Sequence, residues 1–276
     1  CLAYLLAKPE CDLLGVTTVT GEAEKRAMMV SALCKIADKD IPIYPGSEQP
    51  LLIAAQQPHA PQAAALSRWD HATNFPKGQA IDFMRQAIRA NPGEVVLLGI
   101  GPLTNIALLF AIDPEIPSLL KELVLMCGVF DPQNVKNPLR HGCEWNALND
   151  PHATAMVYQA ISGRNRSFGL DVTTQVTMNA ARFREKCQVP LLRPVLDFAE
   201  VWFQQRDIVT FHDPLAAVGI FHKDVCTYTP GTVEVEYRDE KIGGRTYWTP
   251  HTPNARYEVA LEVQPERFFA EYFKVF

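Results

Sequence analysis

Two segments of the chain, residues 95–100 and 121–127, are rich in consecutive apolar residues and have the length of strands. A strand that is apolar on both faces is typical of a parallel sheet that helices cover from both sides. The first segment runs into Gly99-Ile100-Gly101 and the second is followed by Gly128. This pattern constrains the fold more than any other feature of the sequence, and it predicts an α/β architecture.

Strand-like and helix-like segments alternate along the rest of the chain. Further strands are expected at 13–20, 41–44, 167–170, 232–237 and 258–263, and helices at 1–9, 22–39, 80–90, 103–113, 152–160, twice within 176–210, and at 212–221 and 265–273. The alternating pattern of 232–237 is typical of an exposed edge strand, with which 246–248 would form a hairpin. We therefore predict one domain over residues 1–276, with an open, mostly parallel, Rossmann-like sheet flanked by helices and a small C-terminal hairpin.

Charge and cysteine content argue against several classes of protein. The net charge of −5 gives no reason to expect nucleic acid or a membrane surface as a partner. No apolar run reaches the length of about 18 residues that would predict a transmembrane helix. The seven cysteines include no Cys-x-x-Cys pair, so neither a zinc site nor a disulfide framework is expected. Reduced cysteines favour a cytoplasmic location.

His212-Asp213-Pro214 sets a titratable imidazole beside a carboxylate at the start of a predicted helix. Asp followed by Pro is a good signal for the first turn of a helix. Histidine can donate a proton near neutral pH, and aspartate is a common metal ligand. The alternative is that Asp213 only caps the helix and that His212 is an ordinary loop residue.

Other candidate groups follow the predicted strands, where open α/β sheets bind their ligands. Ile100 follows the first apolar strand, and Met126 ends the second. Glu144 and Asn146, in the loop beyond Met126, offer a carboxylate and an amide two residues apart, which suits the hydroxyl groups of a sugar. The alternative is that both are solvated loop residues.

The stretch from 47 to 79 contains several prolines and is expected to be irregular. Long irregular segments of compact domains are often functional lids. Trp69 and His71 lie within this stretch. A lid and a plain surface excursion are equally open at this point.

Six short motifs resemble those of the inosine–uridine-preferring nucleoside hydrolases, and together they span nearly the whole chain. Each is short, but their order and spacing are specific to that family. The motifs are Leu14-Gly15-Val16-Thr17-Thr18-Val19, Gly101-Pro102-Leu103-Thr104-Asn105-Ile106-Ala107, Val124-Leu125-Met126, Glu144-Trp145-Asn146 with Asp150-Pro151, Leu170-Asp171-Val172-Thr173 and His212-Asp213-Pro214-Leu215-Ala216.

The resemblance implies an enzyme that hydrolyses the N-glycosidic bond of ribonucleosides to ribose and a free base, with Ca²⁺ as its cofactor. By matching position, Asp213 and the backbone carbonyl of Ile100 are the implied calcium ligands. His212 is the implied acid that protonates the departing base, a role that suits an imidazole. The implied transition state resembles an oxocarbenium ion, which neighbouring carboxylates stabilise.

The same resemblance implies that Glu144 and Asn146 hold the ribose and that Met126 lines its pocket. Asn137, in the polar loop before Glu144, is a further candidate for substrate binding. The resemblance also implies a role in purine or pyrimidine salvage. The expected partner is a small-molecule nucleoside, without nucleic acid or membrane, and the expected assembly is a homo-oligomer, either a dimer or a tetramer.

The sequence departs from the family at three places. An Asp-rich loop, Asp-x-Asp-x-x-x-Asp-Asp, follows the family's first strand and supplies most calcium ligands and the base that activates water, whereas this sequence begins at Cys1 within the next helix. We therefore expect the native chain to continue upstream of Cys1 with that strand and loop. Gly21-Glu22 stands where Gly-Asn is usual, which weakens one implied ribose contact. No His-Gly loop is recognisable in 59–75, so the preferred base is open, with Trp69 or His71 as candidate substitutes.

Two other classes of function are open from the sequence alone. A relative that keeps the nucleoside pocket without the metal and the base would bind nucleosides and not hydrolyse them. The missing Asp-rich loop favours that hypothesis. The third class is a structural or interaction protein of the same fold, and Glu144, Asn146 and His212 argue against it.

Overall fold

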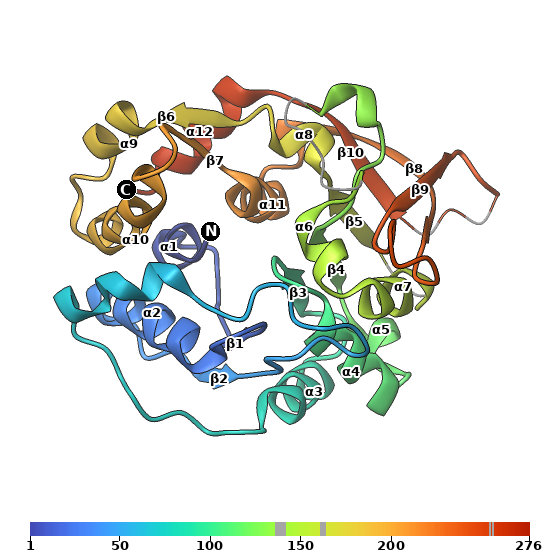
Figure 1. The fold of residues 1–276 in the computed structure, drawn as a ribbon, viewed down its shortest axis with the longest axis horizontal. Coiled ribbons are helices and arrows are strands. Elements are labelled where there is room, and N and C mark those ends of the chain that lie inside the picture. Colours follow the sequence, from blue (N-terminus) through green and yellow to red (C-terminus); the bar gives the residue numbers. More distant parts are fainter. Residues whose placement is uncertain (136–141, 161–163, 254, 256) are drawn as a thin grey trace.

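A six-stranded sheet forms the centre of the structure, a computed structural model that describes residues 1–276 except 136–141, 161–163, 254 and 256 (Figure 1). The strands are β1 (Val16–Thr18), β2 (Ile43–Pro45), β3 (Val96–Gly99), β4 (Glu122–Met126), β5 (Asn165–Phe168), β6 (Thr177–Asn179), β7 (Ile208–Thr210), β8 (Cys226–Val235), β9 (Thr246–Pro250) and β10 (Tyr257–Val263). The order across the sheet is β3-β4-β5-β10-β8-β9, in which the first four strands pair in parallel and the last two antiparallel. Two separate pairs, parallel β1-β2 and antiparallel β6-β7, accompany it.

Helices lie on both sides of this sheet (Figure 1). They are α1 (Leu2–Ala7), α2 (Ala23–Ile36), α3 (Ala80–Ala90), α4 (Thr104–Ile112), α5 (Ile116–Leu119), α6 (Trp145–Asn149), α7 (Pro151–Gln159), α8 (Leu170–Thr173), α9 (Ala180–Lys186), α10 (Arg193–Phe203), α11 (His212–Phe221) and α12 (Pro265–Phe273). Short 3-10 helices are η1 (Pro61–Arg68), η2 (Pro132–Asn134), η3 (Pro190–Leu192) and η4 (Lys223–Val225). Within the described residues, no helix combines the length and the hydropathy that a bilayer span requires.

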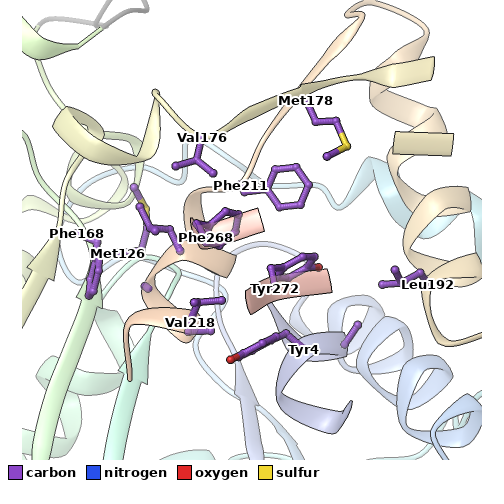
Figure 2. Close-up of a cluster of buried hydrophobic side chains, with 14 of the residues drawn as sticks. Tyr4, Met126, Phe168, Val176, Met178, Leu192, Phe211, Val218, Phe268 and Tyr272 are labelled. Carbon is purple, nitrogen blue, oxygen red and sulfur yellow. The ribbon is translucent and has the colours of Figure 1, made fainter. Parts of the chain in front are cut away.

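The two faces of β4 bury their side chains in two different hydrophobic cores. Val124 and Met126 belong to the core that includes side chains of α1, α11 and α12 (Figure 2). Leu123 and Leu125 belong to the core built with α3, α4 and α7. Successive side chains of a strand point to opposite faces, so a strand covered on both faces is typically a continuous apolar run. This burial explains the apolar run from Leu123 to Met126 in β4.

The predicted class of fold is confirmed, and one detail of the prediction is wrong. The segment 232–237 was expected at the edge of the sheet, yet β8 lies between β10 and β9, and β9 forms the edge. The two helices expected within 176–210 are present as α9 and α10, and this segment also contains the strands β6 and β7, which were not predicted. The expected hairpin is present, because β8 and β9 pair antiparallel.

Candidate functional site

The carboxyl ends of the parallel strands bring the predicted site residues to one edge of the sheet. Gly99 pairs with Leu125 in the β3–β4 register, so Ile100 follows its strand at the level of Met126. Helix α11 begins at His212 and packs its Leu215 into the same core as Met126. The separate motifs around Ile100, Met126 and His212 therefore meet at the edge where α/β sheets bind ligands.

His212 lies in the first turn of α11, and its side chain contacts α8. The Nδ1 atom of His212 is 2.8 Å from the hydroxyl oxygen of Thr173, which is fully buried. Burial lowers the pKa of His212 to about 4, because a low-dielectric surrounding disfavours the charged imidazolium. In the free protein at neutral pH, the ring is therefore a neutral imidazole with one nitrogen engaged.

Asp213 also lies in the first turn of α11, where the helix dipole favours a negative charge. Burial nevertheless raises the pKa of Asp213 to about 6. Among the residues that the structure describes, none donates a hydrogen bond to the Asp213 carboxylate. A bound cation would stabilise the charged form of this carboxylate.

Calcium requires oxygen ligands. The candidate ligands at this site are oxygen atoms, as calcium requires, but there are too few of them to fill its coordination shell. Asp213 offers a carboxylate and Ile100 a backbone carbonyl, whereas calcium usually takes about six to eight oxygens. In the described part of the chain, no group of three or more His, Cys, Asp or Glu side chains could hold a metal ion. The described residues could thus supply part of the coordination shell of a calcium ion, and further ligands are needed to complete it.

Glu144 is the N-cap of α6, and its carboxylate accepts three backbone N–H groups. Oε1 accepts from Asn146 at 2.7 Å, and Oε2 accepts from Ala147 at 3.0 Å and from Gly128 at 3.3 Å. Only 2% of Glu144 is exposed, and burial raises its pKa to about 7 against the effect of these donors. Glu144 is therefore not a solvated loop residue, and it joins α6 to the segment that follows β4.

Asn146 is also buried, and its amide is held in one orientation by β4. Its Nδ2 donates to the backbone oxygen of Met126 at 2.9 Å and lies 3.5 Å from the sulfur of the same residue. Because the amide nitrogen is engaged in this way, the side-chain oxygen is the group that remains to accept a hydrogen bond from a ligand. The structure thus brings Asn146 and Met126 together, as predicted for a ribose pocket.

Other residues singled out in the sequence are engaged elsewhere. The indole nitrogen of Trp69 donates to Asp197 of α10 at 3.1 Å, and Nδ1 of His71 is 2.7 Å from the backbone oxygen of Trp69. The carboxylate of Glu22 pairs with Lys25 and accepts the N–H of Ala60 at 2.7 Å. Trp69 and Glu22 therefore fasten the 47–79 stretch to α10 and to the start of α2, which favours a packed surface excursion.

One predicted residue lies outside the described part of the chain, and two contacts were missed. Asn137 falls within 136–141 and is not described. Thr173 ended a recognised motif, but no role was inferred for it, although it closely follows a strand that ends at the ligand-binding edge. The indole nitrogen of Trp145, which stands between Glu144 and Asn146, donates to Gln57 at 3.1 Å.

Comparisons with known proteins show the family and the fold of the chain. A family model described as inosine-uridine preferring nucleoside hydrolase matches residues 1–270. Uridine nucleosidase 1 of Arabidopsis thaliana is 30% identical over 261 residues, which cover 88% of this chain and 76% of the relative. A solved plant nucleoside hydrolase superposes with a TM-score of 0.84 at 21% identity, covering 99% of this chain and 93% of that chain. A purine-preferring ribonucleoside hydrolase from Gardnerella vaginalis gives a TM-score of 0.83 at 22% identity, with coverage of 99% and 92%.

Proposed function

The chain belongs to the inosine-uridine preferring nucleoside hydrolase family, and from that premise we propose that it is a calcium-dependent enzyme in which His212 protonates the leaving base. As a member of this family it is a nucleoside N-ribohydrolase, which splits the N-glycosidic bond of ribonucleosides. One observation carries the assignment of residues: α11 presents His212 and Asp213 at the carboxyl edge that also holds Met126. A salvage role in the cytoplasm and a homo-oligomeric assembly stay predictions.

His212 acts on the base because it is the titratable side chain at the start of α11 that has a ring nitrogen left for a ligand. Its Nδ1 is engaged by Thr173, so Nε2 is the nitrogen available to the base. The imidazole is neutral in the free protein, since burial lowers its pKa to about 4. A departing base gains negative charge, and an anion within about 4–6 Å favours the protonated imidazole. The ring would therefore take up a second proton from water as the bond breaks, pass the proton on Nε2 to the base, and return to the neutral form.

Asp213 and the carbonyl of Ile100 would hold the calcium ion. The raised pKa of Asp213, about 6 because of burial, supports this role, since a neighbouring positive charge favours the ionised carboxylate. When bound, calcium would supply a positive charge that fixes oxygen ligands such as sugar hydroxyls and water. Glu144, Asn146 and Met126 would form the ribose side of the pocket.

The proposed function is tested by measuring base release from inosine and from uridine, with calcium and with a chelator. Uridine is included because a relative is named a uridine nucleosidase, and inosine because a solved neighbour is named purine-preferring. We expect turnover of at least one nucleoside that falls on chelation and returns when calcium is restored. Turnover that is indifferent to the chelator would contradict the calcium dependence.

Asp213→Asn should lower calcium affinity by about tenfold or more, because a neutral amide replaces the carboxylate and about 1.4 kcal/mol corresponds to tenfold. The measurement is calorimetric titration of the full natural protein with calcium chloride. Asp82→Asn, on the exposed side of α3, removes a carboxylate of the same size and should leave calcium affinity unchanged. Equal affinities in the wild type and in Asp213→Asn would remove Asp213 from the metal site.

Asn146→Ala should raise KM for purine and pyrimidine nucleosides by similar factors, since the ribose is common to both. The variant also leaves the backbone oxygen of Met126 without its side-chain partner, and an unpaired buried group costs about 1–3 kcal/mol. Asn149→Ala is a matched control. Asn149 is a buried amide of the same helix, and it donates to the backbone oxygen of Trp145 at 2.7 Å. A change in the ratio of purine to pyrimidine activity in Asn146→Ala would mean that Asn146 acts on the base.

A further inference from the structure

The contact between His212 and Thr173 joins two helices that are distant in the sequence. The hydroxyl oxygen of Thr173 lies 2.8 Å from Nδ1 of His212, and 0% of Thr173 is exposed. Thr173 ends α8, which follows β5, and His212 begins α11. A buried hydroxyl therefore meets the ring nitrogen at the edge of the sheet where the ligand would bind.

Helix α8 is held firmly enough to give this hydroxyl a fixed position. The N–H of Leu170 donates to the backbone oxygen of Gly128 at 3.0 Å, and the N–H of Phe130 donates to the carboxylate of Asp171 at 2.9 Å. The N–H of Thr173 donates to the oxygen of Gly169 at 3.1 Å. Threonine is also stiff at χ1. The helix that carries the hydroxyl is thus anchored to the segment that follows β4, whose Gly128 also donates to Glu144 of the proposed ribose pocket.

A fixed hydroxyl at Nδ1 controls what the other ring nitrogen can do. A neutral imidazole carries its proton on one nitrogen, and the hydrogen bond at one nitrogen sets the state of the other. When the Thr173 hydroxyl donates to Nδ1, the proton of the ring lies on Nε2. The ring then presents an N–H, and not a lone pair, to a leaving base. When the base departs, the ring takes a second proton from water at Nδ1, the Thr173 hydroxyl turns to accept that Nδ1–H, and the proton on Nε2 passes to the base, so that the ring ends neutral.

We propose that Thr173 is a positioning residue that holds His212 in the Nε2–H form, with Nε2 directed to the leaving base. The proposal rests on the proposed function, in which His212 protonates that base. Thr173 does not touch the substrate in this scheme and acts only through the histidine. Its effect should therefore appear in the reaction step that needs a proton and not in ribose binding.

The test compares Thr173→Val, which keeps the shape and removes the hydroxyl, with Thr173→Ser, which keeps the hydroxyl. We expect Thr173→Val to lower kcat on inosine by about 10–100-fold, the range for partners that orient a functional histidine, with KM little changed. The loss should be small on p-nitrophenyl riboside, whose leaving group needs no proton. Thr173→Ser should restore most of the rate. Thr174→Val is a matched control, because the neighbouring hydroxyl donates to the backbone oxygen of Leu170 at 2.7 Å.

A spectroscopic readout separates positioning from a merely structural role. In protein with ¹⁵N-labelled histidine, the ring nitrogens of His212 should report the Nε2–H form in the wild type and in Thr173→Ser. They should report a mixture of forms in Thr173→Val. A wild-type kcat in Thr173→Val, equal losses on both substrates, or no rescue by serine would each overturn the proposal. Unchanged ring shifts would overturn it as well.

The failure of this inference and the failure of the proposed function give different results. If His212→Ala discriminates between the two substrates while Thr173→Val does not, the inference is wrong and the acid role stands. If His212→Ala lowers both activities equally, the acid role falls, and with it the proposed effect of Thr173 on the leaving base.

Discussion

His212→Ala should lower kcat on inosine by about 10²–10⁴-fold, the usual contribution of a positioned general acid. Without the imidazole, the purine must leave as an anion or take its proton from water. The ring lies at the first turn of α11 with Nδ1 engaged by Thr173, so Nε2 is the ring nitrogen left for the base. The rate of base release at saturating inosine measures the effect.

The chemistry of the leaving group separates an acid from a binding residue. A p-nitrophenyl riboside releases a stable anion that needs no proton, so His212→Ala should affect its hydrolysis far less than that of inosine. His222→Ala is the matched control: His222 is the C-cap of the same helix, and its Nε2 lies 3.2 Å from Nζ of Lys8. That variant should change both activities by the same factor. Equal losses on the two substrates in His212→Ala would contradict the acid role.

The strands of the parallel sheet were predictable because of how they are buried. Residues 95–100 and 121–127 contain β3 and β4, whose ends differ from the prediction by one residue. A strand with both faces in a core is typically a continuous apolar run, and such a run is visible in β3 and, from Leu123 onward, in β4. The buried strand β5 lacks it, since it begins Asn165-Arg166-Ser167. The strands β6 and β7 are three residues each, and they pair across α9 and α10. Because this pairing joins segments on either side of two helices, no local pattern of the sequence contains it.

The position of β8 in the sheet was predicted wrongly. Alternation of apolar and polar residues shows that one face of a strand is buried, and it does not show whether the strand lies at the edge of the sheet. Strand β8 alternates between buried and exposed residues, yet it has antiparallel neighbours on both sides. An antiparallel sheet can have one face in the core and the other in water, wherever the strand lies. The order of strands depends on contacts between distant segments, which no single segment of the sequence contains.

Some features of the candidate site could likewise be predicted from the sequence, and others could not. His212 and Asp213 could be found because Asp-Pro marks the start of a helix, and α11 does begin at His212. The capping role of Glu144 and the contact of Thr173 with His212 were missed. Both depend on which backbone or ring atom lies nearby after folding. The sequence therefore indicates which residues lie at the site, whereas their hydrogen-bond partners depend on tertiary packing.

Arg166→Met should lower the free energy of unfolding by about 3–5 kcal/mol, because it leaves a buried carboxylate without its partner. Arg166 is fully buried, and its guanidinium forms a fork with Glu122. It also donates to the backbone oxygen of Gly219 at 2.8 Å and lies 3.3 Å from the hydroxyl of Tyr228. These bonds join β4, β5, α11 and β8 through one side chain. Urea unfolding followed by circular dichroism measures the change.

The double variant Glu122→Leu with Arg166→Met tests whether the loss of stability in Arg166→Met comes from leaving the Glu122 carboxylate buried without a partner. Removing both partners of a buried pair is often neutral or stabilising, so the double variant should regain most of the lost stability. Arg184→Met is the matched control, since Arg184 forms a similar fork with Glu200 at 2.6 and 2.8 Å while half exposed. It should move the urea midpoint much less. If the double variant is as unstable as Arg166→Met, the bonds to Gly219 and Tyr228 carry the stability. The guanidinium would then act mainly by fixing α11, and with it His212, against the sheet.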